Sequence, residues 1–126
     1  MGSRAREVIE PAELRLDWFE GSAIARLSGD IDLSNAEALK RSIADSMSNQ
    51  ELRLVIDLSD VDYLDSAGIA MLFHLSRRLV EHQQQLILLM PADSSIRRSL
   101  QVSGWPADVP IVESLANPVS GSSEVP

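Results

Sequence analysis

The chain has 126 residues, contains no cysteine and carries a formal net charge of −8 at pH 7. Its length suits a single domain, and its apolar fraction of 44% is typical of a globular protein. The lack of cysteine excludes disulfides, thiolate catalysis and cysteine-ligated zinc, and the acidic charge balance disfavours nucleic acid and anionic membranes as partners.

No apolar run approaches the ~20 residues that span a bilayer, and the N-terminus lacks the apolar core of a secretory signal. We therefore expect a soluble, cytoplasmic protein without membrane insertion. We expect residues 1–12 to form a flexible N-terminal segment.

The first predicted elements are two strands. Residues 13–19 alternate apolar and polar side chains, which is typical of a strand with one solvated face. A short turn at residues 20–22 leads into a second strand at residues 23–29. Because the turn is so short, the two strands are expected to pair as an antiparallel hairpin.

A helix is predicted next, over residues 32–49. Ser34 and Glu37 have the spacing of a capping box, so Ser34 is the expected N-cap. The apolar stripe of this helix, at four-residue spacing, consists of Leu39, Ile43 and Met47.

The second half of the chain alternates short apolar runs with helical patterns. Residues 52–58 and 86–90 are almost continuously apolar, which is typical of strands buried on both faces. The helix between them begins near "DSAG", and its predicted buried face consists of Ile69, Leu72, Phe73, Leu79 and Val80.

A third helix is predicted over residues 95–103, capped by Asp93 or Ser94 and ended by Gly104. A last short strand is expected at residues 109–114, followed by a disordered tail at residues 117–126.

This order of elements predicts an α/β fold in one domain over residues 13–116. Alternating strands and helices favour right-handed crossovers and a mixed, mostly parallel sheet of four to five strands with interspersed helices. The first strand, at residues 13–19, is expected to be antiparallel and to lie at one edge.

Ser66, at the start of the second helix, does not have the surroundings of a catalytic nucleophile. The hydrolase elbow needs Gly-x-Ser-x-Gly, and Leu64 occupies the first glycine position. The two histidines, His74 and His82, lie on the same predicted helix as Ser66 and cannot fold back onto it as a base. We therefore predict a protein that is not an enzyme and has no catalytic residue.

No cofactor or metal site is predicted either. His74 and His82 are eight residues apart, more than two helical turns, and the chain has neither a GxxxxGK[ST] nor a GxGxxG loop. Two interpretations of Ser66 stay open at this point. It is either a plain helix cap or the acceptor of a phosphoryl group, which a helix N-terminus tolerates because backbone N–H groups there accept an anion.

The segments "LSGDID" (27–32), "LVIDLSDVDYLDSAGIAML" (54–72) and "LILL" (86–89) resemble the STAS domain, the sulfate transporter and anti-sigma factor antagonist family. The resemblance covers about residues 13–114 and is strongest to free-standing bacterial anti-anti-sigma factors.

The resemblance implies a mechanism of partner switching. In that family the unphosphorylated protein binds an anti-sigma factor and so releases the sigma factor. The anti-sigma factor is itself a serine kinase that phosphorylates the antagonist and blocks binding, and a phosphatase resets the system. An alternative within the family is a structural subunit of a lipid-transport ATP-binding cassette complex or of a stress-signalling assembly. Self-association stays open.

Carried onto this chain, the resemblance makes Ser66 the phosphorylation site. The residues implied or expected to bind the partner are Asp30, Asp32, Asp65, Ser66, Ala67, Gly68, Met71, Leu75 and Arg78. Ala67 stands where relatives often carry Ser or Thr, which leaves Ser66 as the acceptor in the motif. Met71, Leu75 and Arg78 enter this set because they lie off the predicted buried face of their helix.

Overall fold

The computed structural model describes residues 4–48 and 50–114. The described residues form six strands and three helices along the chain. Their bounds are β1 Arg4–Ile9, β2 Ala12–Phe19, β3 Ser22–Ile31, α1 Ala36–Ser46, β4 Arg53–Leu64, α2 Ser66–Glu81, β5 Gln85–Leu89, α3 Ser95–Val102 and β6 Ile111–Val112. The predicted tail at residues 117–126 lies outside the described residues.

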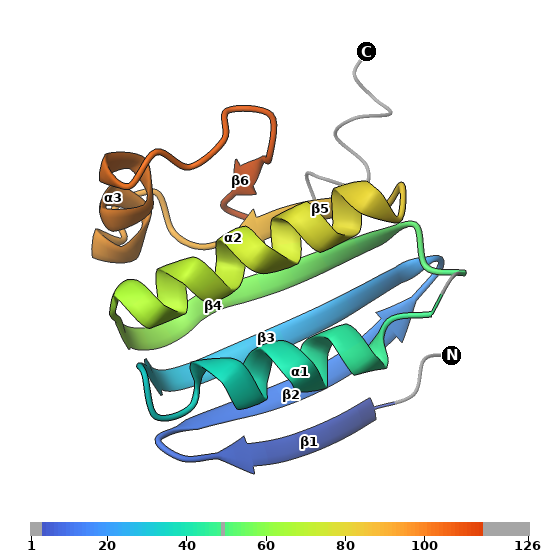
Figure 1. Cartoon of the computed structure of the whole chain (residues 1–126), viewed down its shortest axis with the longest axis horizontal. Coiled ribbons are helices and arrows are strands. Elements are labelled where there is room, and N and C mark those ends of the chain that lie inside the picture. Colours follow the sequence, from blue (N-terminus) through green and yellow to red (C-terminus); the bar gives the residue numbers. More distant parts are fainter. Residues whose placement is uncertain (1–3, 49, 115–126) are drawn as a thin grey trace.

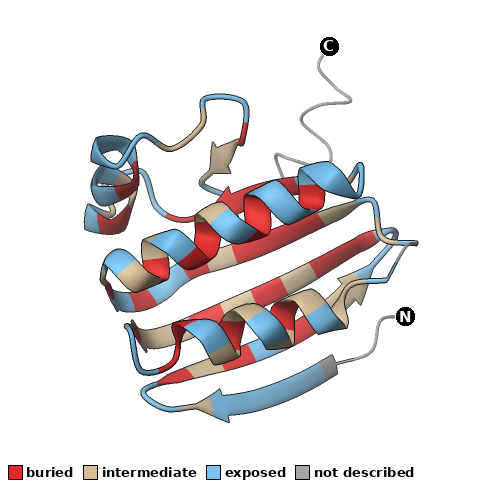
Figure 2. Ribbon diagram, in the orientation of Figure 1, coloured by how far each residue is buried: buried red, intermediate tan, exposed pale blue. Residues whose placement is uncertain are grey.

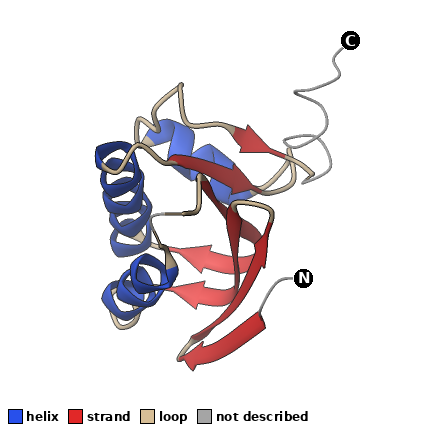
Figure 3. Ribbon diagram, turned by 90° about the vertical axis from the view of Figure 1, so that its right-hand side faces the viewer, coloured by secondary structure: helices blue, strands red, loops and turns tan. Residues whose placement is uncertain are grey.

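All six strands join one mixed sheet in the order β1-β2-β3-β4-β5-β6. The strands β1, β2 and β3 pair antiparallel, whereas β3, β4, β5 and β6 pair parallel. Each parallel connection passes through a helix to the neighbouring strand, and right-handed crossovers in this order place the helices on one face. Figures 1 and 3 show α1 and α2 side by side on that face. The predicted α/β fold with a mixed sheet is confirmed.

The N-terminal segment differs from the prediction. Residues 4–9 form β1, which pairs with β2 through six residue pairs from Arg4↔Asp17 to Ile9↔Ala12. The predicted flexible segment is therefore wrong for these residues, and β2 lies inside the sheet, not at its edge. Figure 2 shows β1 exposed along most of its length. Backbone pairing stabilises this strand with little apolar burial, so the side-chain pattern did not reveal it.

The main core lies between the sheet and the helices. On β4 the buried residues Leu54, Ile56 and Leu58 face α1 and α2, and Val55 and Asp57 face the opposite way. The predicted stripe of α1 is confirmed for Leu39 and Ile43, which are fully buried, and Met47 is half-buried at the C-cap. The helix α3 adds Ile96 and Leu100 to the same core.

The buried face of α2 differs from the prediction. Its buried residues are Gly68, Met71, Leu72, Leu75, Ser76 and Leu79. Leu72 and Leu79 were predicted, Ile69 and Phe73 are only half-buried, and Val80 is 67% exposed. Apolar side chains lie on two adjacent stripes of this helix. The stripe that contains the small residues Gly68 and Ser76 faces the sheet, because small side chains allow a close approach.

Smaller differences concern the ends of the elements. The N-cap of α1 is Asn35, and the predicted capping box is absent, because the Ser34 hydroxyl donates to Asp32 Oδ1. The N-cap of α3 is Ser94, whose Oγ accepts from the Ile96 N–H at 3.1 Å. The strand β4 runs six residues past its predicted end, to Leu64, and the last strand is shortened to two residues.

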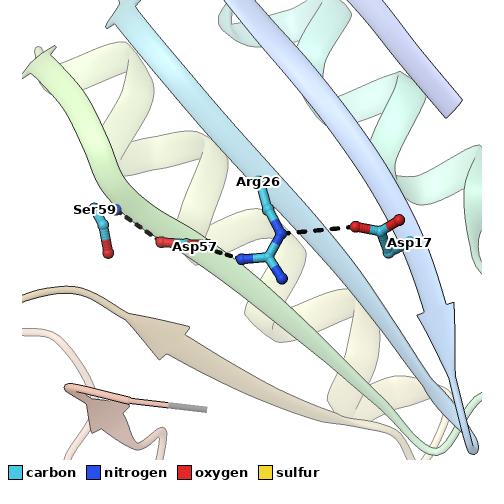
Figure 4. A network of polar contacts seen from close by, with 4 residues as sticks. All are labelled: Asp17, Arg26, Asp57 and Ser59. Atoms are coloured by element: carbon cyan, nitrogen blue, oxygen red, sulfur yellow. Dashed lines mark hydrogen bonds and ion pairs between the residues drawn. The ribbon is translucent and has the colours of Figure 1, made fainter. Parts of the chain in front are cut away.

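The opposite face of the sheet, here called the back face, carries a charged network. Arg26 on β3 contacts Asp57 on β4 at 2.9 Å and Asp17 on β2 at 3.7 Å. The second Asp57 oxygen accepts from the Ser59 N–H at 2.9 Å. Figure 4 shows this row of side chains crossing three strands. Beside it lies a second apolar cluster, formed by Val55, Ile87 and Leu89 with Ile24 and Val112 packed against it.

Candidate functional site

The candidate site lies where β3 and β4 end side by side. The parallel register pairs Asp30 with Tyr63 and Ile31 with Leu64, and the Asp65 N–H donates to the Ile31 carbonyl at 3.1 Å. Ligands and partners of open α/β sheets commonly bind at the carboxyl ends of the parallel strands. The sheet therefore brings the segment after β3 next to the start of α2.

Asp65 connects these two segments. Its Oδ1 accepts from the N–H groups of Ala67 and Gly68, at 2.8 and 3.1 Å, which makes Asp65 the N-cap of α2. Its Oδ2 accepts from the Leu33 N–H at 3.2 Å. Both carboxylate oxygens thus have bonds within the domain. Asp65 was expected to bind the partner, and its geometry shows that it also shapes the site.

Ser66 follows as the first residue of α2, and its side chain is exposed. Among the described residues its hydroxyl has no hydrogen-bond partner, so the oxygen is open to an enzyme from outside. The helix N-terminus does not offer Ser66 the free donors that its position predicts. The Ala67 and Gly68 N–H groups already bond to Asp65, so they are not free to hold a phosphoryl group on Ser66.

Gly68 allows the start of α2 to lie against the ends of the strands. A Cβ atom at this position would be 2.5 Å from Leu64 Cδ1 and 3.0 Å from Ile31 Cγ2. Distances below 3.0 Å to a carbon are far inside van der Waals contact, so a larger residue would push the helix or Leu64 away. Gly68 is buried, so it acts on the site through packing and has little surface to offer a partner.

The other expected acidic residues are Asp30, at the end of β3, and Asp32, directly after it. Asp32 is half-exposed, and its Oδ1 accepts from both the backbone N–H and the hydroxyl of Ser34. Asp30 is half-buried, and its carbonyl accepts from the side chain of Asn35 at 2.9 Å. Asn35 was not identified from the sequence. The available signal was its position directly before the apolar stripe of α1, where an N-cap residue is expected.

Two of the three α2 residues that were expected to lie on an exposed partner surface are buried. Met71 and Leu75 are each 2% exposed and belong to the main core, so they are not part of a partner surface. Twelve positions separate Ser66 from Arg78, which corresponds to about 18 Å along the helix axis. Arg78 is exposed but lies away from the site. Burial therefore removes Met71 and Leu75 from the expected surface, whereas a role of Arg78 in partner binding stays a prediction.

Other side chains provide the apolar surface near Ser66. Leu33 is 82% exposed and Tyr63 is 54% exposed. A shallow groove of about 190 Å³ runs between the starts of α1 and α2, and it is lined by Leu33, Ala36, Glu37, Lys40, Ala67, Ala70, Met71 and His74. Met71 forms only its floor. An exposed leucine beside an apolar groove is a feature that a protein partner can bury.

The positions of acidic residues and histidines in the described part of the chain bear on metal binding. They contain no group of three His, Asp or Glu side chains placed to hold a metal ion. His74 lines the groove, and the His82 ring lies 2.8 Å from the Arg78 carbonyl at the other end of α2. No helix in the described part of the chain is long and apolar enough to cross a membrane.

The chain is similar to several known proteins. BtrV of Bordetella bronchiseptica, which is named as an anti-sigma factor antagonist, is 32% identical over 104 residues, covering 81% of this chain and 87% of BtrV. An anti-sigma factor antagonist from Mycobacterium paratuberculosis has a crystal structure that matches with a TM-score of 0.76 and 23% identity, covering 93% of this chain and all of that one.

A third match is the Bacillus cell fate determinant SpoIIAA in its phosphorylated form. It has a TM-score of 0.67 and 18% identity, and the match covers 86% of this chain and 98% of SpoIIAA. At this identity the match supports the fold alone. The family model described as the STAS domain matches residues 15–117, which include every strand from β3 to β6 and the candidate site. This protein belongs to the STAS domain family.

Proposed function

We propose that this protein is an anti-sigma factor antagonist whose binding to an anti-sigma factor is switched off by phosphorylation of Ser66. The observation that carries the proposal is the exposed Ser66 hydroxyl at the first turn of α2. The Asp65 carboxylate holds this turn beside residues 32–35, here called the Asp32 segment. The relative BtrV is named as an antagonist, and the fold neighbour SpoIIAA has been described in a phosphorylated form.

In the unphosphorylated state the surface at this site combines a small hydroxyl with apolar groups. Ser66, the exposed Leu33 and the groove beside Ala70 offer a partner a neutral contact area. Asp32 lies at its border. The proposed partner is an anti-sigma factor that is also a serine kinase, so the same surface serves as docking site and as substrate.

Phosphorylation changes the charge at the centre of this surface. The kinase transfers the γ-phosphoryl group of ATP to Ser66 Oγ. The bond between the γ-phosphorus and the β–γ bridging oxygen breaks, ADP leaves, and the hydroxyl proton passes to a base of the kinase. The new group adds about −1.5 to −2 charge units. Because Asp65 already occupies the N–H groups of Ala67 and Gly68, the phosphoryl group stays at the surface.

The size of this change is adequate for a switch. A unit charge about 5 Å from a partner carboxylate, at an effective dielectric constant of about 20, is repelled by roughly 3 kcal/mol. With nearly two units of charge, the repulsion is comparable with the ~5.5 kcal/mol that moves a complex from almost fully bound to almost fully free. A phosphatase that removes the group would restore binding.

The proposal is tested by incubating the purified chain with its anti-sigma factor and ATP, followed by intact-mass measurement and phosphopeptide mapping. We expect one phosphoryl group on Ser66. Ser66→Ala should stay folded, accept none and bind constitutively, whereas Ser66→Asp should bind at least about tenfold more weakly, a difference of ~1.4 kcal/mol. The matched control is Ser95→Ala, which removes an exposed hydroxyl at the first position of α3. If Ser66→Ala is phosphorylated like the wild type, the site assignment is wrong.

A further inference from the structure

Asn35 has a buried side chain whose hydrogen bonds go to segments outside α1. It is 1% exposed and stands at the N-cap of α1, yet its side chain makes no capping bond. Asparagine is favoured at N-caps because its side-chain oxygen accepts from the N–H groups of the first turn. The Asn35 side chain does not make that bond, so its hydrogen bonds to other segments need an explanation.

Those interactions hold the Asp32 segment. The Asn35 Oδ1 accepts from the Asp32 N–H at 2.9 Å, and the Asn35 backbone N–H donates to the Asp32 carbonyl at 3.1 Å. The Asn35 Nδ2 donates to the Asp30 carbonyl at 2.9 Å and to the Ile9 carbonyl at 3.1 Å. Asn35 therefore clamps Asp32 at both of its backbone polar groups and uses all the donors and the acceptor of its amide.

The clamp also connects the Asp32 segment to the N-terminal hairpin. Ile9 is the last residue of β1, 26 positions before Asn35. Nearby, the Asp30 N–H donates to the Pro11 carbonyl at 3.2 Å. One side chain thus joins the end of β1, the end of β3 and the segment that leads to Leu33, whose N–H bonds to Asp65 beside Ser66.

We infer that Asn35 is a positioning residue for recognition at Ser66, because it holds the Asp32 segment in the arrangement that the partner binds. The link to recognition rests on the proposed function, whereas the hold on Asp32 does not. Apparent affinity falls in proportion to the fraction of molecules in the competent arrangement, so a segment that is correctly placed a tenth of the time binds about tenfold more weakly.

The test uses Asn35→Ser and Asn35→Asp in the full chain. Both replacements are favoured N-cap residues, so the start of α1 keeps its preference, but neither can donate to two carbonyls through an amide group. The matched control is Ile43→Val, which shortens a fully buried side chain on the same helix and lies away from the site. Amide hydrogen exchange is measured by NMR on the free protein, and Kd is measured for the anti-sigma factor used above.

We expect the Asp32 amide to exchange at least roughly tenfold faster in both Asn35 variants than in Ile43→Val. Serine lacks the amide oxygen that accepts from this N–H, and aspartate places a carboxylate oxygen against the Ile9 and Asp30 carbonyls, which disfavours the same arrangement. The Ala67 and Gly68 amides, which bond to Asp65, should change no more than in the control. Kd should rise about tenfold, and more than in Ile43→Val.

The inference is overturned if the Asp32 amide exchanges no faster than in the control, or if it does but Kd stays at the wild-type value. It is also overturned if both Asn35 variants unfold, because Asn35 would then support the whole domain and not one segment. A wild-type protein that binds no anti-sigma factor would instead refute the proposed function, and the exchange rates would still decide whether Asn35 holds Asp32.

Discussion

At the scale of single residues, three positions of the motif "DSAG" have different structural roles. Asp65 caps α2 and braces the Asp32 segment, Ser66 presents its hydroxyl to solvent, and Gly68 lets the helix lie against the strand ends. Only Ser66 has the exposure that a phosphorylation site needs. The other two act on the site through geometry, so substitutions there should change stability together with recognition.

Replacing Gly68 with alanine should lower the free energy of unfolding by up to about 2 kcal/mol. Alanine favours a helix by ~1 kcal/mol over glycine, but overpacking a buried position costs ~1–3 kcal/mol. The added Cβ meets Leu64 at 2.5 Å, so the packing cost should prevail. Urea unfolding of Gly68→Ala measures the change.

The matched control for Gly68→Ala is Ala70→Gly, an exposed position on the same helix, where only the propensity loss of ~1 kcal/mol applies. Combining Gly68→Ala with Leu64→Val should show a favourable coupling, because the shorter side chain removes the contact. A Gly68→Ala protein as stable as the wild type would contradict the proposed tight contact.

At the scale of elements, the rotation of α2 about its axis decides which side chains a partner can reach. The helix has two adjacent apolar stripes, and the one with Met71 and Leu75 faces the sheet. Apolar residues on the other stripe, such as Val80, therefore remain exposed. Met71 forms the floor of the groove between α1 and α2, so a partner can contact the walls of the groove and not its floor.

Truncating either Met71 or Leu75 to alanine should destabilise the domain by about 2–5 kcal/mol, because each leaves a cavity in the core. The control Val80→Ala, at a position 67% exposed, should stay within about 0.5 kcal/mol of the wild type. Thermal or urea unfolding measures all three. Should the two core variants prove as stable as Val80→Ala and lose only partner binding, the assigned rotation of α2 would be refuted.

At the scale of the whole molecule, the two faces of the sheet have different chemistry. One face packs against α1 and α2, and the back face carries the row Asp17–Arg26–Asp57 beside a small apolar cluster. The chain has a net charge of −8, so a cation between two carboxylates also relieves repulsion within an acidic protein. This row connects β2, β3 and β4 on the face opposite the helices.

Replacing Arg26 with methionine keeps much of the aliphatic stem and removes the charge. We expect a loss of about 1 kcal/mol at low salt, since Arg26 and both carboxylates are only partly buried. The loss should shrink at high salt because screening weakens the ion pairs. Urea unfolding at two ionic strengths measures both effects.

The control is Arg15→Met. Arg15 lies directly across from Arg26 on β2, and like charges in that position repel. Its removal should therefore cost little or stabilise the sheet slightly. Equal losses for the two variants, independent of salt, would show that the ion pairs of Arg26 do not stabilise the fold.

Local sequence patterns were sufficient to predict the order of the elements from β2 to β6, the inward stripe of α1 and the start of α2 at the "DSAG" motif. These features follow from local causes: period-2 and period-3.6 patterns, a short turn, and residues that begin helices. The strand β1 lacks such a pattern, since its residues 5–8 are all exposed, and it exists because β2 offers backbone partners.

The tertiary structure decided which stripe of α2 is buried and how the site is held together. The bond from Leu33 to Asp65 spans 32 positions, and that from Asn35 to Ile9 spans 26. Such contacts depend on the sheet bringing distant segments together, and no short-range periodicity records them. Local patterns could therefore point to Ser66, whereas only the folded chain shows Asp65 and Asn35 holding the segments around it.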